Sequence, residues 1–140
     1  GGQILVGGTS EDHPVVDVPS AGAFLQPTVI GGLSPTSKTA TEEIFGPVVT
    51  LHPFNDEDEA VEMANITEYG LAGSVWSKDP ERGHAFAKRL DTGIVWVNTW
   101  LNRDLRTPFG GVKQSGVGRE GGAWSLNFFS ELTNICVKGP

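Results

Sequence analysis

Charged side chains within a glycine-rich stretch are the first feature of this sequence that points to chemistry. Residues 108–120 read PFGGVKQSGVGRE, which places Arg119 and Glu120 among glycines that disfavour regular secondary structure. Residues 116–121 match G-x-G-x-x-G, a pattern that holds a dinucleotide pyrophosphate when it joins a strand to a helix. Residues 110–115 are mostly glycine or polar and predict no such strand. We therefore expect these glycines to allow close packing of the backbone rather than to bind a dinucleotide.

Two other stretches carry residue types that allow binding or catalysis. Residues 42–47 read EEIFGP, and from the residues alone Glu43 fits a solvated loop carboxylate or a helix-cap acid better than a ligand-binding group. Residues 131–138 are β-prone, and an unpaired strand at a chain end needs a partner. The single cysteine, Cys136, lies in the apolar part of this run, which does not stabilise a thiolate. We expect it to be structural.

The sequence predicts no metal site. One cysteine cannot form a disulfide within the chain or build a zinc site alone. His13, His52 and His84 are scattered without the spacing of metal ligands. The acidic run at 56–59 fits the solvated start of a helix.

Composition favours a folded chain and argues against two kinds of partner. Of 140 residues, 38% are apolar and 19% are charged, which is typical of a globular protein. The formal net charge of −7 disfavours nucleic-acid binding. No apolar run reaches membrane-spanning length and no signal-peptide pattern opens the chain, so we expect a cytoplasmic protein with no membrane partner. The chain begins with Gly1 inside a strand-like stretch, and we expect a piece of a longer protein.

Strand and helix signals alternate along the chain and predict an α/β fold. Each helix signal is a capping residue before an amphipathic run, and each strand signal is a short β-branched run. The predicted strands are an edge or irregular strand at 24–30 interrupted by Pro27, and strands at 48–51, 74–77 and 94–97. The first predicted helix is capped by Asn55 with Asp58 as partner, and its apolar residues are Ala60, Val61 and Ala64. The second predicted helix is capped by Asp79, has Pro80 in its first turn and ends at Gly93. This order implies a parallel sheet covered by helices, with ligands at the carboxyl ends of the strands. The segment from Asn98 onward is therefore the expected site.

Five short motifs in this order resemble NAD(P)-dependent aldehyde dehydrogenases. They are EEIFGP at 42–47, YGLA at 69–72, VWVN at 95–98, PFGGVK at 108–113 and SGVGRE at 115–120. The resemblance covers nearly the whole chain and corresponds to the C-terminal part of such enzymes, whose chains are several hundred residues long. Residues 98–109 look most like the hydroxymuconic and aminomuconic semialdehyde dehydrogenases, although Thr99 stands where cysteine is commoner.

The resemblance implies a cofactor and a division of roles. The family oxidises aldehydes to acids with NAD(P) through a thiohemiacetal and a thioester on a cysteine. The position of Glu43 binds the nicotinamide-side ribose hydroxyls, Phe45 packs beside the nicotinamide ring, and Leu71 lines the same side. We expect NAD, with NADP left open. The family's nucleophilic cysteine, general-base glutamate, oxyanion-stabilising asparagine and dinucleotide-binding glycines lie upstream of this segment, so we expect no catalytic residue here and no activity from this chain alone.

The resemblance also implies a substrate contact. Muconic-type semialdehydes carry a carboxylate away from the aldehyde, and arginine binds carboxylates bidentately. Arg103 is the first candidate for this contact and Arg106 the second, with Phe109 as an apolar wall. The alternative is that both arginines pair with Asp104 or with other loops and only hold the segment together.

Two parts are expected along the chain. Residues 1–129 form a partial catalytic and cofactor-contacting region, and residues 130–140 form an oligomerisation strand and tail. The resemblance implies that residues 130–138 pair with an upstream hairpin and dock onto a neighbouring subunit, giving a dimer or tetramer. An ordinary edge strand is the alternative for this run. Two other functions stay open: a non-catalytic module that self-associates through the same strand, and a small nucleotide-binding protein, against which the glycine motif argues.

Overall fold

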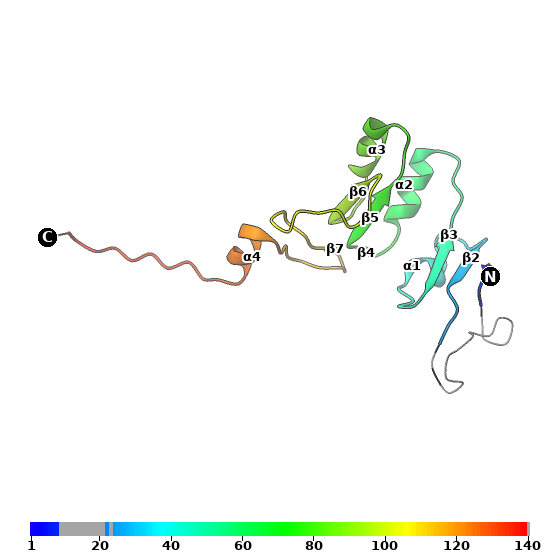
Figure 1. Cartoon of the computed structure of the whole chain (residues 1–140), viewed down its shortest axis with the longest axis horizontal. Coiled ribbons are helices and arrows are strands. Elements are labelled where there is room, and N and C mark those ends of the chain that lie inside the picture. The colour runs from blue at the N-terminus through cyan, green and yellow to red at the C-terminus, as the bar shows by residue number, and fades with distance from the viewer. Residues whose placement is uncertain (9–21, 23, 140) are drawn as a thin grey trace. The chain divides into compact units, whose positions relative to one another are not determined.

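The chain folds into two compact units. The computed structural model describes residues 1–8, 22 and 24–139, and His13 lies outside them. The first unit is Gly1–Thr67 and the second is Glu68–Pro140 (Figure 1). Both units combine helices and strands, as the α/β prediction requires.

The first unit is built on a three-stranded sheet in the order β1-β2-β3. Strand β1 (Gln3–Val6) pairs antiparallel with β2 (Thr28–Gly31), which pairs parallel with β3 (Val48–Leu51). Of the two alternatives predicted for the strand at 24–30, edge or irregular, the edge position is wrong, because β2 lies at the centre of the sheet. The strand begins directly after Pro27, so all of its residues keep the backbone N–H that pairing on both sides requires.

Two helices complete the first unit. Helix α1 (Lys38–Thr41) is one turn long and leads into residues 42–47. Helix α2 (Glu57–Asn65) is capped by Asp56, whose carboxylate accepts the Glu59 N–H at 2.9 Å. The Glu59 carboxylate in turn accepts the backbone N–H of Asn55, the residue before the cap, at 2.7 Å. The predicted cap at Asn55 with Asp58 is wrong by one residue, because the extended residue whose side chain accepts a first-turn N–H is Asp56. Of the predicted apolar face, Ala60 is buried and Ala64 is exposed.

The second unit contains a parallel strand pair joined by a helix. Strand β5 (Ala72–Val75) pairs in register with β6 (Ile94–Val97), and α3 (Pro80–Ala87) is the crossover between them. Asp79 caps α3 by accepting the backbone N–H groups of Glu81 and Arg82, as predicted. Within α3, Gly83 is buried, and a Cβ there would lie 2.9 Å from a Val97 methyl group.

The remaining elements of the second unit join residues that are far apart in sequence. Strands β4 (Tyr69–Gly70) and β7 (Val112–Lys113) pair antiparallel, and α4 (Gly122–Phe128) follows the glycine-rich stretch. The first unit thus has a three-stranded sheet and the second has two strand pairs, and the pairings β2–β3 and β5–β6 are parallel, as predicted. Short β-branched runs indicate that strands exist but do not specify their partners.

Gly93 has a different role from the predicted helix cap. Helix α3 ends earlier, at Ala87, with Lys88 in a right-handed conformation as its cap. Gly93 lies against the backbone of Gly110, and a Cβ on Gly93 would be only 1.6 Å from the Gly110 carbonyl oxygen. The glycine is required for close approach of two backbone segments.

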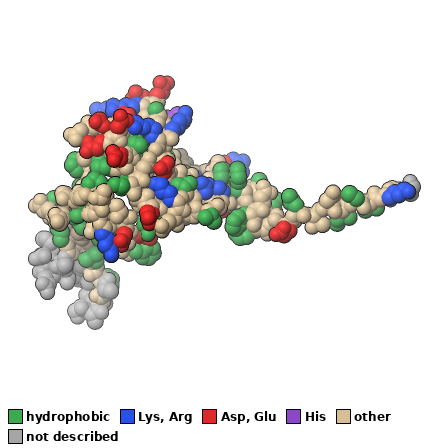
Figure 2. All heavy atoms as spheres, turned by 180° about the vertical axis from the view of Figure 1, so that it is seen from behind, with side chains coloured by type: hydrophobic (Ala, Val, Ile, Leu, Met, Phe, Trp, Pro, Cys, Tyr) green, Lys and Arg blue, Asp and Glu red, His purple; other side chains and the backbone are tan. Residues whose placement is uncertain are grey.

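The C-terminal segment contains no helix or strand in its described residues, 130–139. Its apolar side chains, including Leu132, Ile135 and Val137, are exposed, and Figure 2 shows them in green along the tail. The predicted strand at 131–138 is not formed in this chain by itself, because no described segment pairs with its backbone. The boundary predicted at residue 130 stays a prediction.

Candidate functional site

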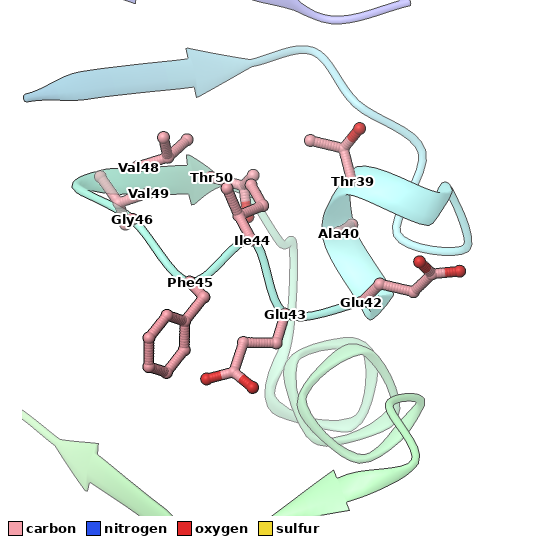
Figure 3. Close-up of a pocket in the computed structure, with 10 residues that line it drawn as sticks. All are labelled: Thr39, Ala40, Glu42, Glu43, Ile44, Phe45, Gly46, Val48, Val49 and Thr50. Carbon is pink, nitrogen blue, oxygen red and sulfur yellow. The ribbon is translucent and has the colours of Figure 1, made fainter. Parts of the chain in front are cut away.

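In the first unit, residues 42–47 border an open hollow of about 610 Å³. Figure 3 shows the hollow between α1 and β3, with the Glu43 carboxylate and the Phe45 ring leaving the chain on the same side of the connecting segment. Residues from α1 and from β3 complete the lining, among them Thr39, Ala40 and Val48–Thr50.

The neighbouring carboxylates of Glu42 and Glu43 differ in their partners. Glu42 caps the end of α1 through its backbone N–H, and its carboxylate lies 3.5 Å from the Lys38 amine. Glu43 is exposed, and its carboxylate has no hydrogen bond or ion pair among the described residues. A carboxylate in this state can accept hydrogen bonds from two hydroxyl groups of a ligand.

Phe45 combines an unfavourable backbone conformation with full exposure. Its φ is 54°, in the left-handed region that disfavours residues with a Cβ, and the residue is 91% exposed. Neither feature helps an isolated chain to fold. Strain of this kind gathers at binding sites, and the flat apolar ring can stack on a ring of a ligand.

The second unit holds Leu71, the third predicted cofactor contact. Leu71 lies between β4 and β5, and its side chain is exposed. Its carbonyl oxygen accepts the Ile94 N–H at 3.2 Å, which joins it to the start of β6.

The segment that follows β6 is held at its start by Asn98. The Asn98 side-chain amide accepts the Ser77 N–H and donates to the Ser77 carbonyl, both at 2.8 Å. The Asn98 backbone N–H donates to Val75, so the side chain extends the pairing of β5 and β6 by one step. Asn98 has a φ of 54°, a conformation that asparagine tolerates better than most residues, and the chain turns there.

The Trp96 side chain on β6 holds the same segment at a second point, Asn102, four residues after Asn98. Trp96 is 6% exposed, and its indole N–H donates to the Asn102 carbonyl at 2.9 Å. The Trp100 ring packs edge-on against Trp96 with 4.8 Å between centroids. Arg103 therefore follows directly after a fixed residue.

Arg103 stacks on Phe109 beside a carboxylate. Its guanidinium carbon lies 4.1 Å from the centroid of the Phe109 ring. One guanidinium nitrogen is 4.0 Å from a Glu120 carboxylate oxygen. Phe109 and Glu120 exchange two backbone hydrogen bonds, of 2.8 and 2.7 Å, in an isolated antiparallel bridge. The structure thus brings together Arg103 and Phe109, two of the three predicted substrate contacts.

Arg106 has a different environment. Its guanidinium pairs with the Asp104 carboxylate, and its backbone N–H donates to the same group at 2.9 Å. The pKa of Asp104 is lowered mainly by the hydrogen bond from the Arg106 side chain and further by the one from the Arg106 backbone. The side-chain hydrogen bond with Asp104 raises the pKa of Arg106. Both forms of the alternative predicted for the arginines are present, because Arg106 pairs with Asp104 and Arg103 lies beside Glu120 of another loop.

The glycine-rich stretch packs backbone against backbone, as predicted. A Cβ on Gly110 would lie 2.2 Å from the Gly118 carbonyl oxygen. The Arg119 guanidinium donates to the carbonyls of Gly111 and Gly118, each at 2.8 Å, and is occupied by these bonds. The two-residue strand β7 and the short helix α4 do not make the strand–turn–helix unit of a dinucleotide-binding fingerprint.

Residues 1–135 match the protein-family model described as "Aldehyde dehydrogenase family". The chain belongs to the aldehyde dehydrogenase family. The resemblance drawn from the five motifs is thereby confirmed at the level of the family.

Two semialdehyde dehydrogenases are similar to this chain over most of its length. The chain is 50% identical over 138 residues to 2-hydroxymuconic semialdehyde dehydrogenase of Pseudomonas putida, covering 99% of this chain and 28% of the relative. It is 52% identical over 118 residues to human 2-aminomuconic semialdehyde dehydrogenase, covering 84% of this chain and 24% of the relative. The chain therefore spans about a quarter of the length of these relatives.

Solved structures agree on the fold. Betaine aldehyde dehydrogenase from Staphylococcus aureus, in complex with NAD⁺, superposes with a TM-score of 0.84 at 42% identity, over 92% of this chain and 25% of that one. Aldehyde dehydrogenase from Mycobacterium tuberculosis, also with NAD⁺, gives a TM-score of 0.81 at 37% identity, over 94% of this chain and 26% of that one.

The site predicted from the sequence left out two residues that the structure places in it. Asn98 and Glu120 were not assigned roles, although one follows a strand in a conformation typical of asparagine and the other pairs with Arg103. No cluster of three or more metal-ligating side chains occurs among the described residues, and none of their helices has the length and apolar character needed to cross a membrane. The roles of Glu43, Phe45, Leu71, Arg103, Arg106 and Phe109 stay predictions.

Proposed function

We propose that this chain is the C-terminal part of an NAD-dependent aldehyde dehydrogenase that oxidises a carboxylate-bearing semialdehyde to the acid. The observation that carries the proposal is the 50% identity, over 99% of the chain, to an enzyme named for 2-hydroxymuconic semialdehyde. Because the chain spans 28% of that enzyme, the cysteine that forms the thioester and the glutamate that activates water belong to the proposed upstream part.

In this proposal, the hollow of the first unit receives the nicotinamide end of the cofactor. The nicotinamide accepts the hydride when the cofactor is bound. The unpartnered Glu43 carboxylate accepts hydrogen bonds from ribose hydroxyls, and the exposed Phe45 ring stacks on the nicotinamide side. Leu71 adds an apolar contact. The NAD⁺ complexes of two family members support a nicotinamide cofactor, and NAD is the one proposed, with NADP left open.

The substrate contact belongs to the segment after β6. Arg103 binds the carboxylate far from the aldehyde, and the Phe109 ring under the guanidinium supports its orientation. Arg106 is the second candidate, with its guanidinium shared with Asp104. Arginine suits this task because its donors form a planar fork that matches a carboxylate.

The proposal includes self-association through residues 130–138. The apolar side chains Leu132, Ile135 and Val137 are exposed, and the unpaired backbone around them is suited to pairing in a strand. We expect self-association through this run to give a homo-oligomer, either a dimer or a tetramer. The cytoplasm is the proposed location of the enzyme.

Intact mass and NAD⁺-dependent aldehyde oxidation by the natively expressed gene product test the proposal. We expect a protein of several hundred residues that oxidises muconic-type semialdehydes. A stable product of 140 residues that self-associates without activity would instead indicate a non-catalytic module.

A further inference from the structure

The feature that carries a further inference is the group formed by Arg103, Phe109 and Glu120. The Arg103 guanidinium has one face on the Phe109 ring at 4.1 Å and one nitrogen 4.0 Å from the Glu120 carboxylate. The Arg103 side chain is 29% exposed, whereas the Glu120 side chain is 62% exposed. The guanidinium is held in place, and its counterion lies on the solvent side.

The backbone fixes this spacing. Phe109 and Glu120 exchange two backbone hydrogen bonds in one isolated bridge, so the ring and the carboxylate are held together independently of Arg103. The other cations nearby in sequence have partners of their own. Arg119 is bound to two carbonyl groups, Arg106 to Asp104, and the Lys113 amine lies 3.7 Å from Asp91. Glu120 is thus the carboxylate that the structure assigns to Arg103.

The distance of 4.0 Å makes this a weak pair. It exceeds the range of a hydrogen bond, so the attraction is Coulombic and is reduced by solvent. A carboxylate that accepts two parallel N–H bonds from the guanidinium interacts more strongly. An arriving carboxylate can therefore displace Glu120, and Glu120 can return when the ligand leaves.

We propose that Glu120 is a specificity-determining residue, the resident counterion of Arg103 that competes with the substrate carboxylate. This inference rests on the proposed function, in which Arg103 binds that carboxylate. Glu120 lowers the affinity for carboxylate-bearing substrates and for the product, which carries two carboxylates. It has no such effect on neutral aldehydes.

The test compares two aldehydes of similar length in the full-length enzyme: succinate semialdehyde, which carries a carboxylate, and butanal, which is neutral. We expect Glu120→Gln to lower KM for succinate semialdehyde about two- to fivefold, the size of effect of one exposed ion pair, and to leave KM for butanal unchanged. Inhibition by succinate should strengthen by a similar factor, which gives a binding readout even if turnover falls. Glu81→Gln, which removes an exposed carboxylate on α3, is the charge-matched control.

The Arg103→Ala background separates the possible failures. There, adding Glu120→Gln should change neither KM nor inhibition by succinate. If Glu120→Gln raises KM for succinate semialdehyde, or changes both substrates alike, the counterion role is refuted while the enzyme's activity stands. If Arg103→Ala itself leaves the ratio of the two KM values unchanged, the arginine contact of the proposed function is refuted together with this inference.

Discussion

Residues 42–47, which connect α1 to β3 and are called the turn below, and the segment at 98–122 present their functional side chains in opposite ways. In the turn, Glu43 has no partner among the described residues, and Phe45 is exposed on a strained backbone. In the segment, Arg103 is stacked on Phe109 and faces Glu120. In the turn, the Glu43 carboxylate and the Phe45 ring are left for a bound molecule to contact. The segment orders its groups in advance, which reduces the entropy lost on binding.

The largest expected effect comes from breaking the ordered region at its closest backbone contact. Gly93→Ala places a Cβ 1.6 Å from the Gly110 carbonyl oxygen, so the segment must move away from the start of β6. We expect the free energy of unfolding to fall by about 3 kcal/mol, measured by denaturant titration of the expressed protein. The matched control is Gly73→Ala on β5, where a Cβ meets only ordinary contacts at 3.6 Å or more. Equal stability of the two variants would contradict this packing.

A second test compares the two arginines. Arg103→Ala should raise KM for succinate semialdehyde about tenfold or more relative to butanal, because it removes a charged hydrogen-bond donor to the carboxylate. Arg106→Ala should change the same ratio about twofold, since the Arg106 side chain is 87% exposed and its guanidinium pairs with Asp104. The reverse order of effects would assign the contact to Arg106.

A third test addresses the unpartnered carboxylate of the turn. Glu43→Gln should slow hydride transfer about three- to tenfold, because an amide replaces one of two equivalent acceptors and shifts the nicotinamide. Single-turnover formation of NADH at saturating NAD⁺ measures this step. Glu62→Gln, on the exposed side of α2, is the control. A single-turnover rate equal to that of the parent enzyme would exclude a positioning role for Glu43.

The smallest expected effect concerns the strain at Phe45. Phe45→Gly should be more stable than Phe45→Ala by about 1 kcal/mol, because glycine adopts a φ of 54° without a Cβ penalty. Both variants lose the ring, so both should bind NAD⁺ more weakly than the parent by similar factors. Thermal unfolding and NAD⁺ titration measure the two quantities. If the alanine variant were the more stable, the left-handed conformation would carry no strain.

Local signals predicted the elements that depend on a few neighbouring residues. Asp79 followed by Pro80 identifies the start of α3, and β-branched runs identify β3 and β6. Pairings between distant residues had no such signal. Tyr69 and Lys113 are partners in β4 and β7, and only the fold brings them together.

The candidate site shows the same division. The resemblance to aldehyde dehydrogenases pointed to Glu43, Phe45 and Arg103, whereas from the residues alone Glu43 fitted a solvated carboxylate better than a ligand-binding group. The pairing of Arg103 with Glu120 depends on the backbone bridge between Phe109 and Glu120. Residues that are eleven positions apart and joined by glycines cannot be paired from local sequence.

The Asn98 amide also bears on how this region can evolve. By replacing a peptide group opposite Ser77, it closes the strand pair before the chain turns, while the backbone bridge at Phe109 fixes where the chain returns. Residues 99–108 thus form a loop whose two ends are fixed by Asn98 and Phe109. Exchanging this loop between relatives should transfer substrate preference, while β5 and β6 keep their register.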